Sequence, residues 1–189
     1  KEILISRFQT YNEKFMIDFI PLEYYYDVLI YFCFFLVVTN LLHAYTLDLN
    51  NPKNIKFLRT SGWLLLILIV AYLGLRPLSV IFGDMGVYAK DFKSYAAGAP
   101  VRTDQDYMFQ YYMKLLSTLV GVEGFFLISS TLYVLPMFII SKKYFKDYWF
   151  YGFLMFVVSF SFYTYGTNGI RNGLATSFFY GAYAFLKRK

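Results

Sequence analysis

Five long apolar segments constrain this chain more than any other feature. They cover residues 27–45, 57–75, 124–140, 148–165 and 170–186, and polar or charged residues separate them. Each segment is about long enough to cross roughly 30 Å of hydrocarbon as a helix. We therefore predict an all-α, polytopic helical membrane protein with about five transmembrane helices.

Composition supports this class and excludes several others. Of the 189 residues, 58% are hydrophobic and only 16% are charged, whereas soluble domains carry about 25% charged residues. The net charge of +6 does not indicate a nucleic-acid partner, because the basic residues cluster at the ends of the apolar segments. The single cysteine, Cys33, and the single histidine, His43, offer no disulfide, metal cluster or histidine-based triad. We expect no metal and no cofactor.

The basic residues also predict which side of the membrane each loop faces. Clusters at 52–59, 142–147 and 187–189 hold nine of the 18 Lys and Arg and a single acid, Asp147. Alternating spans put all three clusters on one side, which is then cytoplasmic. The outer loop 76–123 and the turn 166–172 would face the opposite side.

The same pattern divides the chain into two parts. Residues 1–26 alternate charged and aromatic residues, and we predict an extracytoplasmic or leader segment there. Residues 27–189 would form the transmembrane domain. Two interpretations of the start stay open: Met16 as the true first residue, or a chain that begins within a longer protein. We expect further spans after Lys189.

Within the outer loop, residues Asp104 to Val120 have helical periodicity. Gln110, Lys114 and Ser117 share one face, while apolar side chains group on another. This pattern fits a helix that lies flat on the outer membrane surface. It equally fits an ordinary helix that packs against the bundle.

Two arginines are predicted at the outer boundary of the membrane. Arg76 ends the second apolar segment and Arg171 begins the fifth. A guanidinium group suits phosphate, because its planar fork donates two hydrogen bonds and keeps its charge. Arg171 would also lie at a helix N-terminus, which favours an anion. The alternative is that both arginines extend to lipid headgroups.

Four other outward-facing residues are candidates for the same site. Asp84 would act as general base for a sugar hydroxyl, or would simply pair with an arginine. Tyr88 would stack on a sugar ring, or belong to the aromatic belt of the membrane interface. Asn168 and Asn172 accompany Arg171 in one turn and would bind the substrate with it.

These residues resemble a family signature. The stretch 168–175, Asn-Gly-Ile-Arg-Asn-Gly-Leu-Ala, resembles the Asn-x-x-Arg-x-x-Leu-Ala run that opens a span in EpsG-family membrane proteins, relatives of Wzy-type polysaccharide polymerases. In that family an Arg-Pro, a Gly-Asp and a Tyr follow an earlier span, as Arg76-Pro77, Gly83-Asp84 and Tyr88 do here. The chain departs from the family in a wider Arg-Pro to Asp spacing and in the absence of Thr before the Asp.

The resemblance covers roughly residues 24–189 and implies a function. The full-length protein would be an enzyme that polymerises repeat units carried on undecaprenyl pyrophosphate, for exopolysaccharide, capsule or O-antigen. It would act at the outer face of the bacterial cytoplasmic (inner) membrane, in a fold similar to large helical membrane glycosyltransferases, of which this chain is the N-terminal portion. Asp84 and Arg171 would be catalytic, and Arg76, Tyr88, Asn168 and Asn172 would bind substrate.

The implied partners are a lipid-linked oligosaccharide, membrane lipid and other polysaccharide-assembly proteins. Two other classes stay open. A transporter or flippase subunit for lipid-linked sugars would also use outward-facing arginines, but should carry charged residues or broken helices near mid-bilayer. A non-catalytic membrane scaffold would tolerate Lys or Gln at Arg76 and Arg171.

Overall fold

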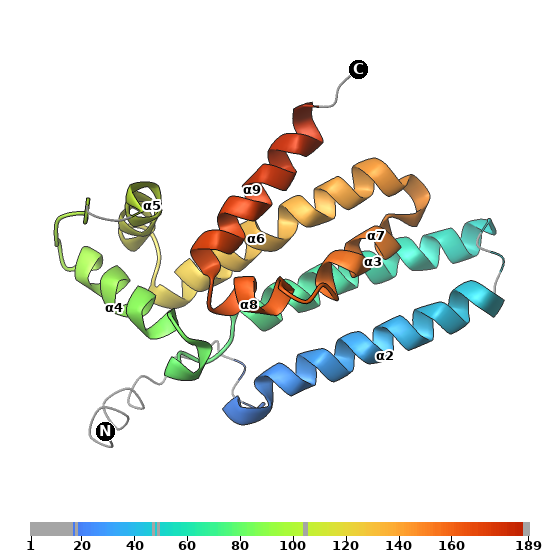
Figure 1. Cartoon of the computed structure of the whole chain (residues 1–189), viewed down its shortest axis with the longest axis horizontal. Coiled ribbons are helices and arrows are strands. Elements are labelled where there is room, and N and C mark those ends of the chain that lie inside the picture. The colour runs from blue at the N-terminus through green and yellow to red at the C-terminus, as the bar shows by residue number, and fades with distance from the viewer. Residues whose placement is uncertain (1–16, 18, 47, 49, 104–105, 187–189) are drawn as a thin grey trace.

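A computed structural model describes residues 17, 19–46, 48, 50–103 and 106–186, and within them every regular element is helical (Figure 1). The α-helices are α2 (Tyr25–Thr46), α3 (Pro52–Gly74), α4 (Met85–Ala96), α5 (Tyr107–Ser117), α6 (Val122–Phe145), α7 (Trp149–Val157), α8 (Phe162–Thr167) and α9 (Ile170–Leu186). Three short 3-10 turns join them: η1 (Leu22–Tyr24), η2 (Val80–Phe82) and η3 (Lys146–Tyr148). The predicted all-α class is confirmed.

Three stretches of the described residues are long and apolar enough to cross a membrane. They are Leu22–Thr46, Pro52–Gly74 and Val122–Val157. The first and third contain the predicted spans 27–45 and 124–140, and the second covers the predicted span 57–75 up to Gly74. The predicted count of five spans is not confirmed. The fifth predicted span is the helix α9, which has 17 residues and is not among the three.

The fourth predicted span, 148–165, is not one helix. It divides into α7 and α8, with a break at residues 158–161. There the Ser159 hydroxyl donates to the Phe156 carbonyl at 2.8 Å, and the Ser159 N–H donates to the same carbonyl at 3.1 Å. Serine side chains that bond to nearby carbonyls compete with the helical ladder, so a segment that is apolar overall still contains a turn at its serines.

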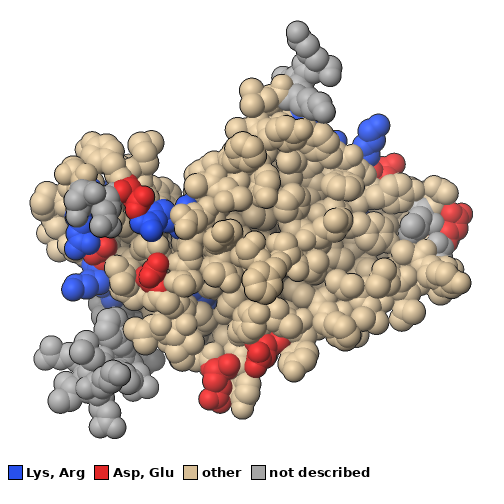
Figure 2. Space-filling model, in the orientation of Figure 1, with Lys and Arg blue, Asp and Glu red and all other residues tan. Residues whose placement is uncertain are grey.

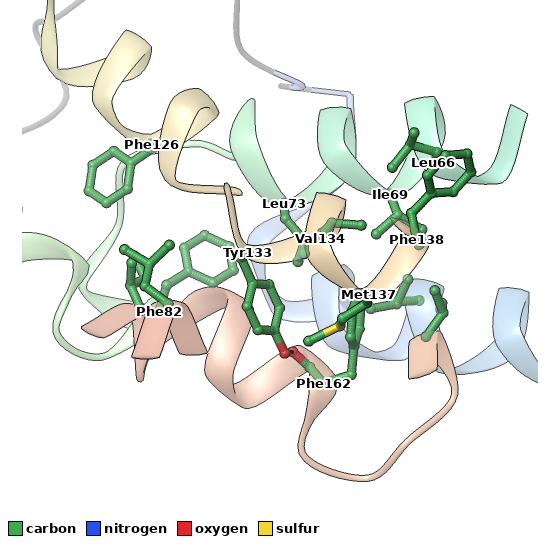
Figure 3. Packing of buried hydrophobic residues seen from close by; sticks show 14 of the residues in the cluster. Leu66, Ile69, Leu73, Phe82, Phe126, Tyr133, Val134, Met137, Phe138 and Phe162 are labelled. Carbon is green, nitrogen blue, oxygen red and sulfur yellow. Dashed lines mark hydrogen bonds between the residues drawn. The ribbon is translucent and has the colours of Figure 1, made fainter. Parts of the chain in front are cut away.

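Helix α6 is the centre of the bundle. It packs against α3 on one side and against α9 and α7 on the others. Figure 3 shows its side chains Tyr133, Val134, Met137 and Phe138 among those of α3 and α8. The Tyr133 hydroxyl donates to the Phe162 carbonyl at 3.0 Å in the buried interior, which fixes α8 against α6.

The chain crosses this body repeatedly, so segments distant in sequence meet at its two ends (Figure 1). The basic clusters 52–59 and 142–147 lie at one end, where Arg59 and Asp147 form an ion pair. At the other end are η2, α4, α5 and the junction between α8 and α9. Both groupings match the arrangement predicted from charge. The third basic cluster, 187–189, and most of segment 1–26 lie outside the described residues.

Figure 2 shows charged side chains at these two ends and at the start of α2, with an uncharged surface between them. Three apolar helices and an uncharged middle indicate a membrane protein. The side of the membrane that each end faces stays a prediction.

Helix α5 forms as predicted, but its polar face is turned inward. Gln110 is buried and accepts a hydrogen bond from the Tyr95 hydroxyl at 2.7 Å. Lys114 donates to the Tyr95 and Ala99 carbonyls at 3.1 and 3.0 Å. The exposed side chains are apolar: Met108, Tyr111 and Leu115. The helix therefore packs on the bundle through Gln110 and Lys114 together with buried apolar side chains, and it presents a second apolar face outward.

Candidate functional site

Asn168 joins the two motifs that the sequence singles out. Its side-chain Oδ1 accepts a hydrogen bond from the Asp84 backbone N–H at 2.9 Å, across 84 positions of the chain. Gly83 makes this approach possible, because its φ is +63° and a Cβ placed there would lie only 2.1 Å from the same Oδ1. The Gly83-Asp84 turn and the start of α9 are thus one structural unit.

Arg171 lies in the first turn of α9 and pairs with Asp106, the residue that precedes α5. The two side chains are 41% and 42% exposed, so the pair is open to solvent and can exchange partners. The carboxylate paired with Arg171 is therefore not that of Asp84. The sequence prediction placed Asp106 inside a helix from Asp104 to Val120 and did not include it in the site, whereas α5 begins only at Tyr107.

Tyr88 lies on α4 between these charged groups. Its side chain is buried and meets the Phe109 ring edge-on, with centroids 5.3 Å apart. Burial raises the pKa of Tyr88; the charges of Asp84 and Asp106 and a hydrogen bond with Asp84 raise it further, while Arg171 lowers it. The Tyr88 hydroxyl is therefore neutral, and its packed ring is not free to stack on a sugar.

Arg76 lies at the same end but inside the protein. Only 1% of it is exposed, so it does not extend to lipid headgroups. It donates to the Leu73 and Thr167 carbonyls and lies 5.6 and 5.4 Å from the centres of the Phe82 and Phe126 rings. Burial lowers the pKa of Arg76 to about 10, so it stays charged at neutral pH. It ties the end of α3 to the residue before Asn168.

The exposed part of the site contains one cation (Arg171), two carboxylates (Asp84 and Asp106) and two amides (Asn168 and Asn172). Asn168 and Asn172 are both exposed, on either side of Arg171. An anion with more than one negative charge would compete with the Asp106 carboxylate for Arg171. The free N–H groups of the α9 first turn would add to that attraction. Asp84, held through its own backbone, would be free to accept a proton.

A helical body with three apolar stretches long enough to cross a membrane, and with a charged cluster at one end, indicates a membrane protein. The chain belongs to the EpsG family, whose family model matches residues 59–189. This range includes both motifs and confirms the resemblance seen in the sequence. No curated protein and no solved structure matches the chain.

Proposed function

We propose that the full-length protein polymerises or transfers sugar repeat units carried on undecaprenyl pyrophosphate at the outer face of the cytoplasmic membrane. Membership of the EpsG family supports a role in polysaccharide biosynthesis at the membrane. The observation that carries the finer proposal is the union of Gly83-Asp84 with Asn168 and Arg171 at one end of the bundle.

The reaction needs a base and an anion site side by side. The acceptor hydroxyl oxygen forms a bond to the anomeric carbon of the donor, and its proton passes to the Asp84 carboxylate. The bond between that carbon and the pyrophosphate oxygen breaks, and the electron pair leaves with the lipid pyrophosphate. Arg171 and the N-terminus of α9 stabilise the charge that grows on this leaving group.

Arg76 takes a supporting role in this proposal. Its buried guanidinium donates to the Thr167 carbonyl at 3.1 Å, next to Asn168. It therefore positions the turn that carries Asn168 and Arg171 rather than touching the substrate. Asn168 and Asn172 are the exposed amides that would bind sugar hydroxyls or phosphate oxygens.

A flippase for lipid-linked sugars is the second candidate, and one observation favours it. Transporters often carry discontinuous helices, and the break between α7 and α8 at residues 158–161 is such a feature. That break holds Ser159, Phe160 and Ser161 and no charged residue. It therefore lacks the ionisable groups that would bind a pyrophosphate there, and the polymerase remains the better-supported function.

Complementation of a polymer-deficient bacterium with the full-length gene tests the proposal. Arg171→Ala removes the anion site, and loss of one preorganised donor lowers the rate by about 10²–10³-fold, so long glycan chains should disappear from the gel. Arg171→Lys should fail as well, since an ammonium group lacks the planar fork. Arg102→Ala is the matched control: it breaks another outer-end ion pair, with Asp91, and should leave chain length unchanged.

The membrane face on which lipid-linked repeat units accumulate distinguishes a polymerase from a flippase. A polymerase defect leaves lipid-linked single repeat units on the outer face, whereas a flippase defect leaves them on the cytoplasmic face. Normal long chains from Arg171→Ala, at wild-type membrane levels, would contradict both proposals and favour a non-catalytic scaffold.

A further inference from the structure

A second polar cluster lies at the opposite end of the molecule from the candidate site. A pocket of about 340 Å³ opens there between α3, α6, η3 and the start of α7. Its lining residues are Arg59, Trp63, Lys142, Lys146, Asp147 and Trp149. We propose that this pocket binds a phosphate-bearing anion, which in the membrane is the headgroup of an anionic phospholipid. The proposal does not depend on the proposed function.

The charge of the pocket favours an anion. Three cationic side chains and one carboxylate line it, which leaves a net charge of +2 (3 − 1). Asp147 is already engaged by Arg59, and both side chains are about half exposed. A phosphate group would meet a surplus of positive charge contributed by three separate elements.

Lys142 is held in place without a carboxylate. Its Nζ lies 5.1 Å from the ring centroid of Trp63, 5.4 Å from that of Phe138 and 5.7 Å from that of Trp149. Aromatic faces attract a cation but do not neutralise it. The ammonium group is therefore positioned in advance and keeps its full charge for a ligand.

The aromatic walls place the pocket at headgroup depth. The chain has two tryptophans, and both of them line this pocket. Tryptophan is enriched at the boundary between headgroups and hydrocarbon. Gly62 shapes the wall, because a Cβ there would lie 2.3 Å from the Trp149 ring. The pocket thus offers cations for a phosphate beside apolar surface for the first part of an acyl chain.

Membrane topology alone does not account for this arrangement. Lys53 and Lys56 lie exposed at the same end of α3 and would serve the positive-inside rule from the surface. Arg59, Lys142 and Lys146 are also exposed, but they converge on one pocket. Basic pockets between helices on the cytoplasmic side are known to hold anionic lipid headgroups.

Tryptophan fluorescence gives a direct test, because both tryptophans line the pocket. The protein in neutral detergent is titrated with dihexanoyl phosphatidylglycerol, and with dihexanoyl phosphatidylcholine in parallel. We expect a saturable change with phosphatidylglycerol and none, or one at least about tenfold weaker, with phosphatidylcholine. Lys142→Ala and Arg59→Gln should each weaken phosphatidylglycerol binding by about tenfold or more. The double variant Lys53→Ala/Lys56→Ala removes two charges from the same end and should bind like wild type.

Several outcomes would overturn the proposal. Equal affinity for the two lipids would exclude recognition of net negative charge. Unchanged binding in Lys142→Ala, or equal loss in the Lys53/Lys56 control, would exclude the pocket. Lys142→Gln serves as a second neutral variant if Lys142→Ala does not fold, and Lys142→Arg should retain binding. A parallel titration with inorganic phosphate distinguishes a free phosphate ligand from a lipid headgroup. If phosphate gives a saturable fluorescence change and phosphatidylglycerol added afterwards causes no further change, the ligand is free phosphate and the lipid is excluded.

Discussion

Asn168 gives the candidate site its geometry through a single side-chain oxygen. That oxygen accepts the Asp84 N–H at 2.9 Å and lies against Gly83, where any side chain would collide with it. The proposed roles of Asp84 and Arg171 depend on this contact, because it sets how close the proposed general base and anion site can lie. A methyl group added at Gly83 is large enough to push Asn168 away from the Gly83-Asp84 turn.

Gly83→Ala should therefore abolish polymer formation. The new Cβ would lie 2.1 Å from Asn168 Oδ1, and φ of +63° is strained for alanine. Such backbone strain costs about 1–3 kcal/mol of stability. The collision would in addition push Asn168 away from the backbone N–H of Asp84. Glycan chain length and thermal unfolding in detergent would both be measured.

Gly98→Ala is the matched control for this prediction. Gly98 has φ of +96° and no atom within 4 Å of a Cβ placed there, so it carries the strain without the collision. We expect a similar loss of stability with polymer retained. Equal polymer from Gly83→Ala and Gly98→Ala would show that contact with Asn168 is not needed.

At the scale of elements, α5 is attached to the rest of the protein by buried contacts such as those of Gln110 with Tyr95 and of Phe109 with Phe125, and by two charged side chains. Lys114 holds its later part to the carbonyls of α4 and the following loop, and Asp106 ties its start to Arg171 of α9. The second tie is half exposed, and exposed ion pairs contribute about 1 kcal/mol or less. The start of α5 is therefore the more easily released part.

Asp106→Asn should loosen this start without unfolding the protein. We expect faster hydrogen exchange over 107–113, unchanged exchange in α9, and a change in global stability below about 1 kcal/mol. Polymer should persist because Arg171 keeps its charge. Asp147→Asn, which breaks a somewhat more exposed pair at the other end, should leave exchange in α5 unaltered. Loss of polymer as severe as in Arg171→Ala would instead identify Asp106 as a catalytic carboxylate.

The elements also show what the sequence could and could not predict. Long apolar runs identified α2, α3 and α6, because a helix in hydrocarbon needs length and hydropathy alone. The hydropathy pattern did not predict the break after α7, because this break depends on a serine hydroxyl that donates a hydrogen bond to the Phe156 carbonyl inside a run that is apolar overall. The inward direction of the polar face of α5 was not predicted for a related reason. Periodicity groups Gln110 with Lys114, but it does not show that their hydrogen-bond partners are Tyr95 and two backbone carbonyls.

The candidate site was predicted in the same uneven way. The motif residues Asp84, Asn168 and Arg171 were expected on one side of the membrane, and the structure brings them to one end of the bundle. Their partners were not predictable, because Asp106 and the burial of Arg76 follow from tertiary packing rather than from spacing.

The whole molecule has two chemically different ends, and the proposed function depends on which end faces outward. One end holds the candidate site; the other holds two basic clusters joined by Arg59 and Asp147. The positive-inside rule predicts that the basic end lies in the cytoplasm. A lipid-linked repeat unit exposed on the outer face would then meet Arg171 directly.

Cysteine labelling in intact bacteria tests this orientation. Cys33, which lies buried in α2, is first replaced by serine, and single cysteines are placed at Lys90 on α4 and at Lys53 on α3, both exposed. A membrane-impermeant maleimide should label Lys90→Cys from outside and Lys53→Cys only after permeabilisation, because about 30 Å of hydrocarbon separates the two ends. A third reporter, Leu186→Cys at the far end of α9, should behave like Lys53→Cys if α9 crosses the membrane despite its 17 residues. The reverse pattern at Lys90 and Lys53 would put Asp84 and Arg171 in the cytoplasm, out of reach of any outer-face donor, and would exclude the proposed polymerase whatever the Arg171 variants do.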